Sequence, residues 1–223
     1  MLDRLALEPS LIEKTYARLL DAIGDGTLPP GARIRQAELA AWLGVSRQPV
    51  SHALHLLRRQ GLVEDAGLKG MQVVPLDPAR VQQLYQVREV VDGLAARLAA
   101  ERVAAGRAEP AVIERLEALA AAGYPPETPV PAMVRADTEF HRSLARLSGN
   151  PAIEEMTAPL WPHLMRSMGY ILDTSPYRAQ VWREHAAILA LILAGEAEKA
   201  ERAARRHAEI AAARTADRLQ AAA

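Results

Sequence analysis

The spacing of apolar residues changes once along the chain, near residue 75. Before that point, three segments with helical periodicity, over residues 15–23, 36–43 and from 47 onward, are followed by two short extended runs around a glycine-bounded turn. After it, strand signals disappear and helical periodicity continues almost to the last residue. The pattern predicts a mainly α protein with two domains, over residues 1–75 and 76–223.

The second domain is predicted to be an all-α bundle. Breaks at glycine, proline and polar turn residues divide it into six helices, over residues 78–105, 110–122, 131–147, 152–172, 177–194 and 196–219. Pro159 and Pro162 are expected to kink the fourth of these helices.

The third periodic segment of the first domain has two distinct faces. Gly44 supplies a turn, Ser46 is suited to cap the helix, and Pro49 falls in the first helical turn, where its missing N–H costs little. The apolar residues with helical spacing form the expected buried face, Val50, Ala53, Leu54 and Leu57. The polar residues of the segment are left to point outward, Arg47, Gln48, Ser51, His52 and His55.

Three helices and a hairpin together predict a winged helix-turn-helix. In that fold the N-terminal residues of the third helix enter the major groove of DNA, and the hairpin reaches the backbone or the minor groove. Eight basic and five acidic residues between Lys14 and Val74 give this domain a net charge of +3, whereas the whole chain, with 27 basic and 27 acidic residues, is neutral. A neutral protein cannot hold phosphates through its overall field, so we expect a local basic face and a dimer that doubles it.

Composition excludes several other classes of protein. The chain has no cysteine, which rules out disulfides and thiolate metal sites. Its first residues lack the apolar run of a signal peptide, and no later run approaches the roughly 18 apolar residues that span a bilayer. We therefore expect a cytoplasmic protein.

Four polar residues of the helical domain occupy positions that the periodicity assigns to the core. Asp137 and His141 are four residues apart on one helix face, and His185 and His207 are each flanked by apolar residues. One carboxylate and three imidazoles facing an apolar interior form a ligand set for a divalent metal such as zinc, nickel or manganese. Each histidine taken alone is more typical of a hydrogen-bonded core residue. The four together favour one shared metal ion per chain, because burying them without a partner costs several kcal/mol.

Arg88 also lies on an apolar stripe, between Leu84 and Val91. A planar guanidinium suits a carboxylate, so Arg88 is a candidate for binding a small organic acid. An ion pair with Asp92 or another acidic residue explains its position equally well.

Residues Pro29 to Glu64, PPGARIRQAELAAWLGVSRQPVSHALHLLRRQGLVE, resemble the DNA-binding domain of GntR-type bacterial transcription regulators. The resemblance implies operator contacts from Arg35, Arg47, Ser51 and the wing residues Lys69 and Gly70. Ser51 departs from the family, which has an arginine there, and a hydroxyl loses the bidentate grip on guanine. The neighbouring polar residues are candidates to compensate, and with the capping serine they complete the expected DNA-binding set, Ser46, Gln48 and His52.

A second resemblance covers the helical domain. The run DTEFHRSL from Asp137, then Gly149-Asn150, Glu184-His185 and Arg206-His207, is similar to the FCD effector domain of the FadR-like branch of the same family, although here the last histidine directly follows its arginine. Many members of that branch bind a metal through the aspartate and the histidines, and an arginine at the position of Arg88 commonly faces the ligand cavity. The expected six helices indicate the VanR-like subgroup.

Together these features predict a homodimeric, metal-containing transcription regulator that binds an inverted-repeat operator. A small carboxylate effector is expected to bind between the metal and Arg88 and to change operator affinity. The alternative is a metal-dependent hydrolytic enzyme, in which the same aspartate and histidines activate a water molecule. The attached winged domain favours the regulator.

Overall fold

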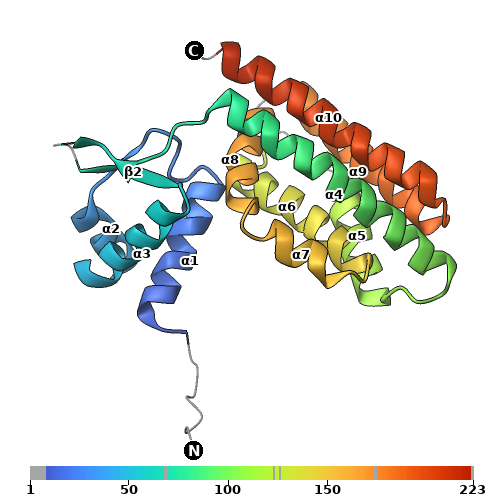
Figure 1. The fold of residues 1–223 in the computed structure, drawn as a ribbon, viewed down its shortest axis with the longest axis horizontal. Helices are drawn as coiled ribbons and strands as arrows, with labels where there is room; N and C mark the ends of the chain where they lie inside the picture. The colour runs from blue at the N-terminus through green and yellow to red at the C-terminus, as the bar shows by residue number, and fades with distance from the viewer. Residues whose placement is uncertain (1–8, 68–69, 123, 126, 173–174, 222–223) are drawn as a thin grey trace, which may run out of the picture. The chain divides into compact units, whose positions relative to one another are not determined.

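The computed structural model describes residues 9–67, 70–122, 124–125, 127–172 and 175–221 (Figure 1). The contacts within the chain divide it into two compact units, Met1–Pro75 and Leu76–Ala223.

The first unit consists of three helices and a small antiparallel sheet. Its elements are α1 (Leu11–Gly24), β1 (Arg33–Ile34), α2 (Gln36–Leu43), α3 (Arg47–Arg59), β2 (Val63–Asp65) and β3 (Met71–Val73). The strand order is β1-β3-β2, so the hairpin of β2 and β3 is extended by a third strand. The sequence analysis missed β1, because a pair of residues is too short to show alternation and its pairing with β3 is a tertiary contact.

Helix α3 has the two faces that its sequence predicts. Val50, Ala53, Leu54 and Leu57 are all at most 1% exposed and pack in one apolar cluster that includes Leu19 of α1. The capping prediction was wrong in part, because Ser46 occupies the N-cap position but its side chain makes no capping hydrogen bond. The N-terminal turn of α3 therefore keeps its backbone N–H groups available to another acceptor.

The second unit is a helical bundle. Its helices are α4 (Pro78–Ala104), α5 (Pro110–Ala121), α6 (Val130–Leu147), α7 (Pro151–Thr157), α8 (Trp161–Leu172), α9 (Ser175–Leu193) and α10 (Ala197–Ala221). Helices α4 and α10 run side by side along much of their length (Figure 1).

The predicted fourth helix of this unit is broken rather than kinked. Helix α7 ends at Thr157 and α8 begins at Trp161, with Pro159 in the turn between them. A proline lacks the N–H that would continue the helix, whereas Pro162 lies in the first turn of α8, where no such N–H is needed. The described residues therefore form seven helices in place of the expected six, and helix number no longer favours the VanR-like subgroup.

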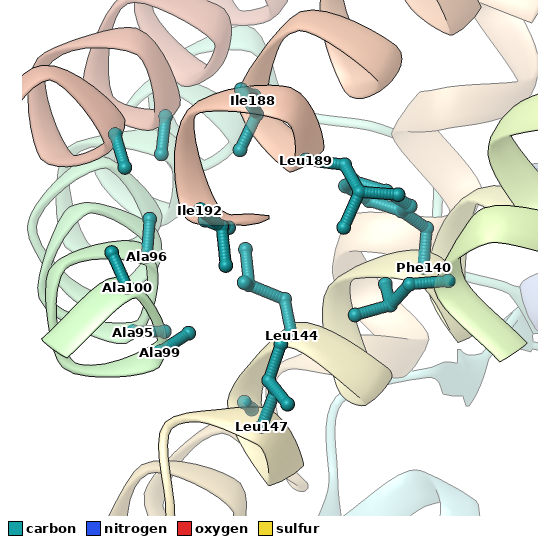
Figure 2. Packing of buried hydrophobic residues seen from close by; sticks show 14 of the residues in the cluster. Ala95, Ala96, Ala99, Ala100, Phe140, Leu144, Leu147, Ile188, Leu189 and Ile192 are labelled. Atoms are coloured by element: carbon teal, nitrogen blue, oxygen red, sulfur yellow. The ribbon is translucent and has the colours of Figure 1, made fainter. Parts of the chain in front are cut away.

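Small residues on α4 let the helices of the bundle approach closely. Figure 2 shows Ala95 and Ala99 of α4 on the side of Leu144 of α6. Ala96 and Ala100 of the same helix belong to the same apolar cluster, and these five residues are at most 2% exposed. A second apolar cluster contains buried residues nearer the N-terminal ends of α4, α6 and α9. Between the positions that supply the two clusters lie Arg88 and Asp92 on α4, Asp137 on α6, His185 on α9 and His207 on α10, and His141 directly follows Phe140 of the first cluster.

The α3 core gives a direct test of the first unit. Leu57→Ala should destabilise it by about 2–5 kcal/mol, because the deletion leaves a cavity in a fully buried position. Its neighbour Leu56 is 40% exposed, so Leu56→Ala is the matched control and should change stability by about 0.5 kcal/mol or less. Urea denaturation of the two variants measures the difference, and equal losses would contradict the packing of α3.

Candidate metal centre

The buried polar residues of the bundle come together in one layer. Helix α4 supplies Arg88 and Asp92, α6 supplies Asp137 and His141, and α9 and α10 supply one histidine each. All of them are buried, and His185 has no exposed surface at all. The four residues predicted as metal ligands are therefore neighbours in space, although they come from three helices.

Three imidazoles converge at the centre of this layer. One nitrogen from each of His141, His185 and His207 lies within 4.8 Å of the other two. The Nε2 atoms of His185 and His207 are 3.3 Å apart. Asp137 completes the group, with Oδ1 3.5 Å from Nε2 of His185 and Oδ2 3.9 Å from Nε2 of His141.

Two carboxylates fix the orientation of two of these rings. Oδ2 of Asp92 lies 3.2 Å from Nδ1 of His141, and Oε2 of Glu184 lies 2.8 Å from Nδ1 of His207. The second contact is a hydrogen bond, whereas the first is an ion-pair distance without hydrogen-bond geometry. A carboxylate beside Nδ1 favours a proton on that nitrogen and leaves the lone pair on Nε2 for the shared centre. Glu184 is itself held by Arg214, whose Nη2 donates to Oε1 over 3.3 Å.

These positioning roles were not predicted from the sequence. Asp92 was expected only as an ion-pair partner for Arg88, and no part in the metal site was predicted for Glu184. The available signal was that Asp92 follows Arg88 by one helical turn and that Glu184 precedes a core histidine. Which ring nitrogen each acid reaches depends on how the helices pack.

Burial keeps the imidazoles of His141 and His185 in the form that binds metal. It lowers the pKa of His141, and the charge of Arg88 lowers it further. Burial also lowers the pKa of His185 well below the usual 6.5, and the neighbouring imidazoles of His207 and His141 act in the same direction. Both rings are therefore neutral near pH 7, as a metal ligand must be.

The two carboxyl groups that contact histidine Nδ1 atoms, Asp92 and Glu184, stay ionised. Burial alone would raise the pKa of Asp92, but its interactions with His141 and Arg88 lower it to about 2. Burial likewise opposes ionisation of Glu184, and the hydrogen bond with His207 and the charge of Arg214 nevertheless lower its pKa. An ionised carboxylate behind an imidazole increases the basicity of its ligating nitrogen.

The donor set fits a divalent metal ion. Two nitrogens that each lie about 2.0–2.1 Å from a tetrahedral zinc are about 3.3 Å apart, and the Nε2 atoms of His185 and His207 have this separation. Nδ1 of His185 has no hydrogen-bond partner among the described residues, and its ring stacks on Phe140 with centroids 4.1 Å apart. His141, His185, His207 and Asp137 would hold the ion, which would supply positive charge and open coordination positions for an anion.

Arg88 lies beside this group and makes the ion pair that was the alternative explanation of its position. Its Nε donates to Oδ2 of Asp92 over 3.0 Å, and its Nη2 contacts Nε2 of His141. Its guanidinium also lies 5.4 Å from the centroid of the Tyr85 ring. Arg88 therefore places a cationic group next to the histidines in this layer.

A small cavity of about 10 Å³, close to the space of one water molecule, adjoins the site. Arg88, Asp137 and His207 are among the residues that line it. The other lining residues are mainly apolar and come from α4, α8, α9 and α10, namely Tyr85, Met168, Ile171, Leu172, Val181 and Ala211. The cavity is thus mainly apolar and adjoins one guanidinium, one carboxylate and one imidazole.

The residues predicted to contact DNA lie mostly at the surface of the first unit. Those exposed to solvent are Arg35, Ser46, Arg47, Gln48, His52 and Gly70, whereas Ser51 is half-buried. Arg35 pairs with Glu38 at 2.7 Å in an exposed ion pair, which a phosphate can replace at little cost. Gly70 has a φ of +88°, which favours glycine at the hairpin turn. Lys69 lies outside the described residues.

Comparison with known proteins finds two family models that match different parts of the chain. Residues 11–73 match the family model of bacterial regulatory proteins of the gntR family, and residues 83–210 match the FCD domain. An uncharacterized HTH-type transcriptional regulator in an unstable DNA locus of Streptomyces ambofaciens is 32% identical over 86% of this chain and 79% of its own length.

Two further proteins support the same likeness. A probable D-xylose utilization operon transcriptional repressor of Paenarthrobacter nicotinovorans is 30% identical over 83% of this chain and 80% of its own. The crystal structure of a GntR transcriptional regulator from Rhodococcus sp. RHA1 has a TM-score of 0.77 and 27% identity, and covers 92% of this chain and 96% of that one. Within the described ranges, no helix is both long and apolar enough to cross a membrane.

The Arg88–Asp92 pair yields a stability prediction for the metal-free protein. Asp92→Asn should lower the free energy of unfolding by about 3 kcal/mol at neutral pH, because it leaves a buried guanidinium without its counter-ion. Arg97 and Glu101 form a pair with the same spacing and the same 3.0 Å distance on the exposed side of α4, so Glu101→Gln is the matched control. It should cost about 1 kcal/mol or less.

The difference in free energy of unfolding between wild type and Asp92→Asn should depend on pH in a defined direction. The pKa of Asp92 is lowered from 3.8 to about 2, so its stabilising contribution is present above pH 3.8 and is lost as the pH falls toward 2. Urea denaturation of wild type and Asp92→Asn, both with a chelator, measures this difference in free energy of unfolding. It should be constant from neutral pH down to about pH 3.8 and should become smaller below that pH. If Asp92→Asn loses less free energy of unfolding than the Glu101→Gln control does, then Arg88 and Asp92 do not form a buried, charged pair.

Proposed function

The chain belongs to the GntR family of bacterial regulatory proteins and carries an FCD domain, and from this premise we propose that it is a homodimeric, metal-containing regulator whose operator affinity changes when a small carboxylate binds. Its families and relatives are DNA-binding transcription regulators, not enzymes, so the chain is not the metal-dependent hydrolase that the ligand set alone allows. The convergence of three imidazoles and one carboxylate inside the FCD domain carries the proposal.

The effector site is the cavity beside the metal position. An anion there would meet the metal ion and the guanidinium of Arg88, both in surroundings that exclude water and so strengthen each contact. The apolar lining from Met168 and Val181 favours an acid with a short apolar part. By linkage, the effector and the operator must alter each other's affinity by the same factor.

The operator-binding surface is the exposed N-terminal part of α3 together with the hairpin turn. Arg47 is the first residue of α3 and is exposed, which is the position from which a recognition helix reaches base edges. A dimer would present two such helices to an inverted repeat and would double the local basic charge of an otherwise neutral chain. We assign the protein to the FadR-like branch and to the bacterial cytoplasm, where operator DNA is found.

Loss of the Arg47 side chain should weaken specific DNA binding. Arg47→Ala is expected to cost about 1–3 kcal/mol on an operator fragment, because a guanidinium in the major groove contributes about that much discrimination. Arg59 is exposed at the other end of α3, so Arg59→Ala is the matched control and should bind nearly as wild type does. Footprinting and titration on the DNA flanking the gene measure both; equal affinities for all three proteins would remove α3 as the recognition helix.

Purified protein should contain about one divalent metal ion per chain. His141→Ala and His207→Ala should each reduce the metal content strongly, because each removes a nitrogen that faces the shared centre. His55 is an exposed histidine of α3 and serves as the control, so His55→Ala should keep its metal. Elemental analysis after gel filtration gives the content; unchanged metal in both bundle variants would make these residues ordinary core histidines.

A further inference from the structure

We propose that the Arg88 guanidinium occupies the metal-binding nitrogen of His141 in the metal-free protein and that metal binding displaces it toward the anion-binding cavity. Arg88 would then act twice, first as a competitor of the metal and then as a ligand of the effector. The inference rests on the proposed function, because it assumes a metal ion at the histidine cluster. It adds an order to the two binding events, metal first and carboxylate second.

The competition follows from the two nitrogens of His141. Nδ1 faces Asp92 at 3.2 Å, so only Nε2 offers a lone pair to the centre of the layer. That lone pair is already in contact with Nη2 of Arg88. One lone pair cannot accept a proton donor and bind a metal ion at the same time, so Arg88 must leave His141 before the ion can bind there.

Asp92 determines how far Arg88 can move. Its Oδ2 atom accepts from Nε of Arg88 over 3.0 Å and also lies 3.2 Å from Nδ1 of His141. Asp92 is thus a positioning residue that holds the metal ligand and the arginine with one carboxylate oxygen. A metal ion would repel the guanidinium by charge, and this planar group would turn as a unit about its side-chain torsions while Asp92 keeps it within reach.

The cavity explains why the displaced guanidinium would bind an anion. Arg88 lines the cavity beside Asp137 and His207, so the released N–H donors need to move only within the site they already border. At about 10 Å³ the cavity has no room for a carboxylate while Arg88 contacts His141. Displacement by the metal would make room and supply an unpaired donor pair in the same movement.

Zinc titration of the metal-free protein tests the competition. Arg88→Gln should bind zinc about tenfold or more tightly than wild type does, the factor expected when a charge-assisted hydrogen bond no longer has to be broken. Arg88→Lys separates competition from charge, because it keeps the cation but not the planar fork that reaches Asp92 and His141 together. Tighter zinc binding in both variants supports displacement. Arg97→Gln, at an exposed site on the same helix, is the control and should match wild type.

The other outcomes separate this inference from the proposed function. If wild type binds zinc and both Arg88 variants bind it with wild-type affinity, the displacement is wrong and the metal site stands. If only Arg88→Gln tightens binding, the effect is one of charge and the displacement is again wrong. If neither wild type nor any variant binds zinc, both proposals fail.

Acetate, as a minimal carboxylate, tests the order of binding. Calorimetry should detect it on zinc-loaded wild type and find binding about tenfold or more weaker on the metal-free protein, because the charge-assisted contact of Arg88 with His141 must then be broken first. Equal acetate affinity with and without zinc would overturn the proposed order.

Discussion

The contacts of two carboxylates with histidine Nδ1 atoms are the interactions on which the centre of the bundle depends. Asp92 and Glu184 each direct one imidazole so that its second nitrogen faces a common point. Without these partners the rings would be buried polar groups free to adopt either tautomer, and their nitrogens would not converge. The same two acids also hold Arg88 and Arg214, so the charges of the layer are paired inside the protein.

The apolar packing on both sides gives this polar layer its chemical character. One cluster with many alanines lies on one side and a cluster of larger side chains lies on the other, and together they exclude water from the histidines. Burial then keeps His141 and His185 neutral, as a metal requires, while paired cations keep the acids ionised. The arrangement that stabilises the bundle is therefore also the one that prepares it to bind a cation and, beside it, an anion.

The sequence was sufficient for features that depend on local periodicity. The faces of α3 and the burial of Asp137, His141, His185 and His207 could be predicted because a polar residue on an apolar helical stripe must face the interior. Features that depend on contacts between distant segments could not be predicted. They include the pairing of β1 with β3, the acid that each ring nitrogen reaches, and the contact of Arg88 with His141. The break between α7 and α8 is a local feature that was misjudged, because two nearby prolines allow either a kink or a stop.

The most direct test of this account is the tautomeric state of the histidines in the metal-free protein. Long-range proton–nitrogen NMR spectra distinguish a proton on Nδ1 from one on Nε2 in each ring. The carboxylate contacts predict that His141 and His207 both carry their proton on Nδ1 and leave Nε2 unprotonated. A proton on Nε2 of either ring at neutral pH would contradict the account, since that nitrogen would then have no lone pair to offer to a metal ion.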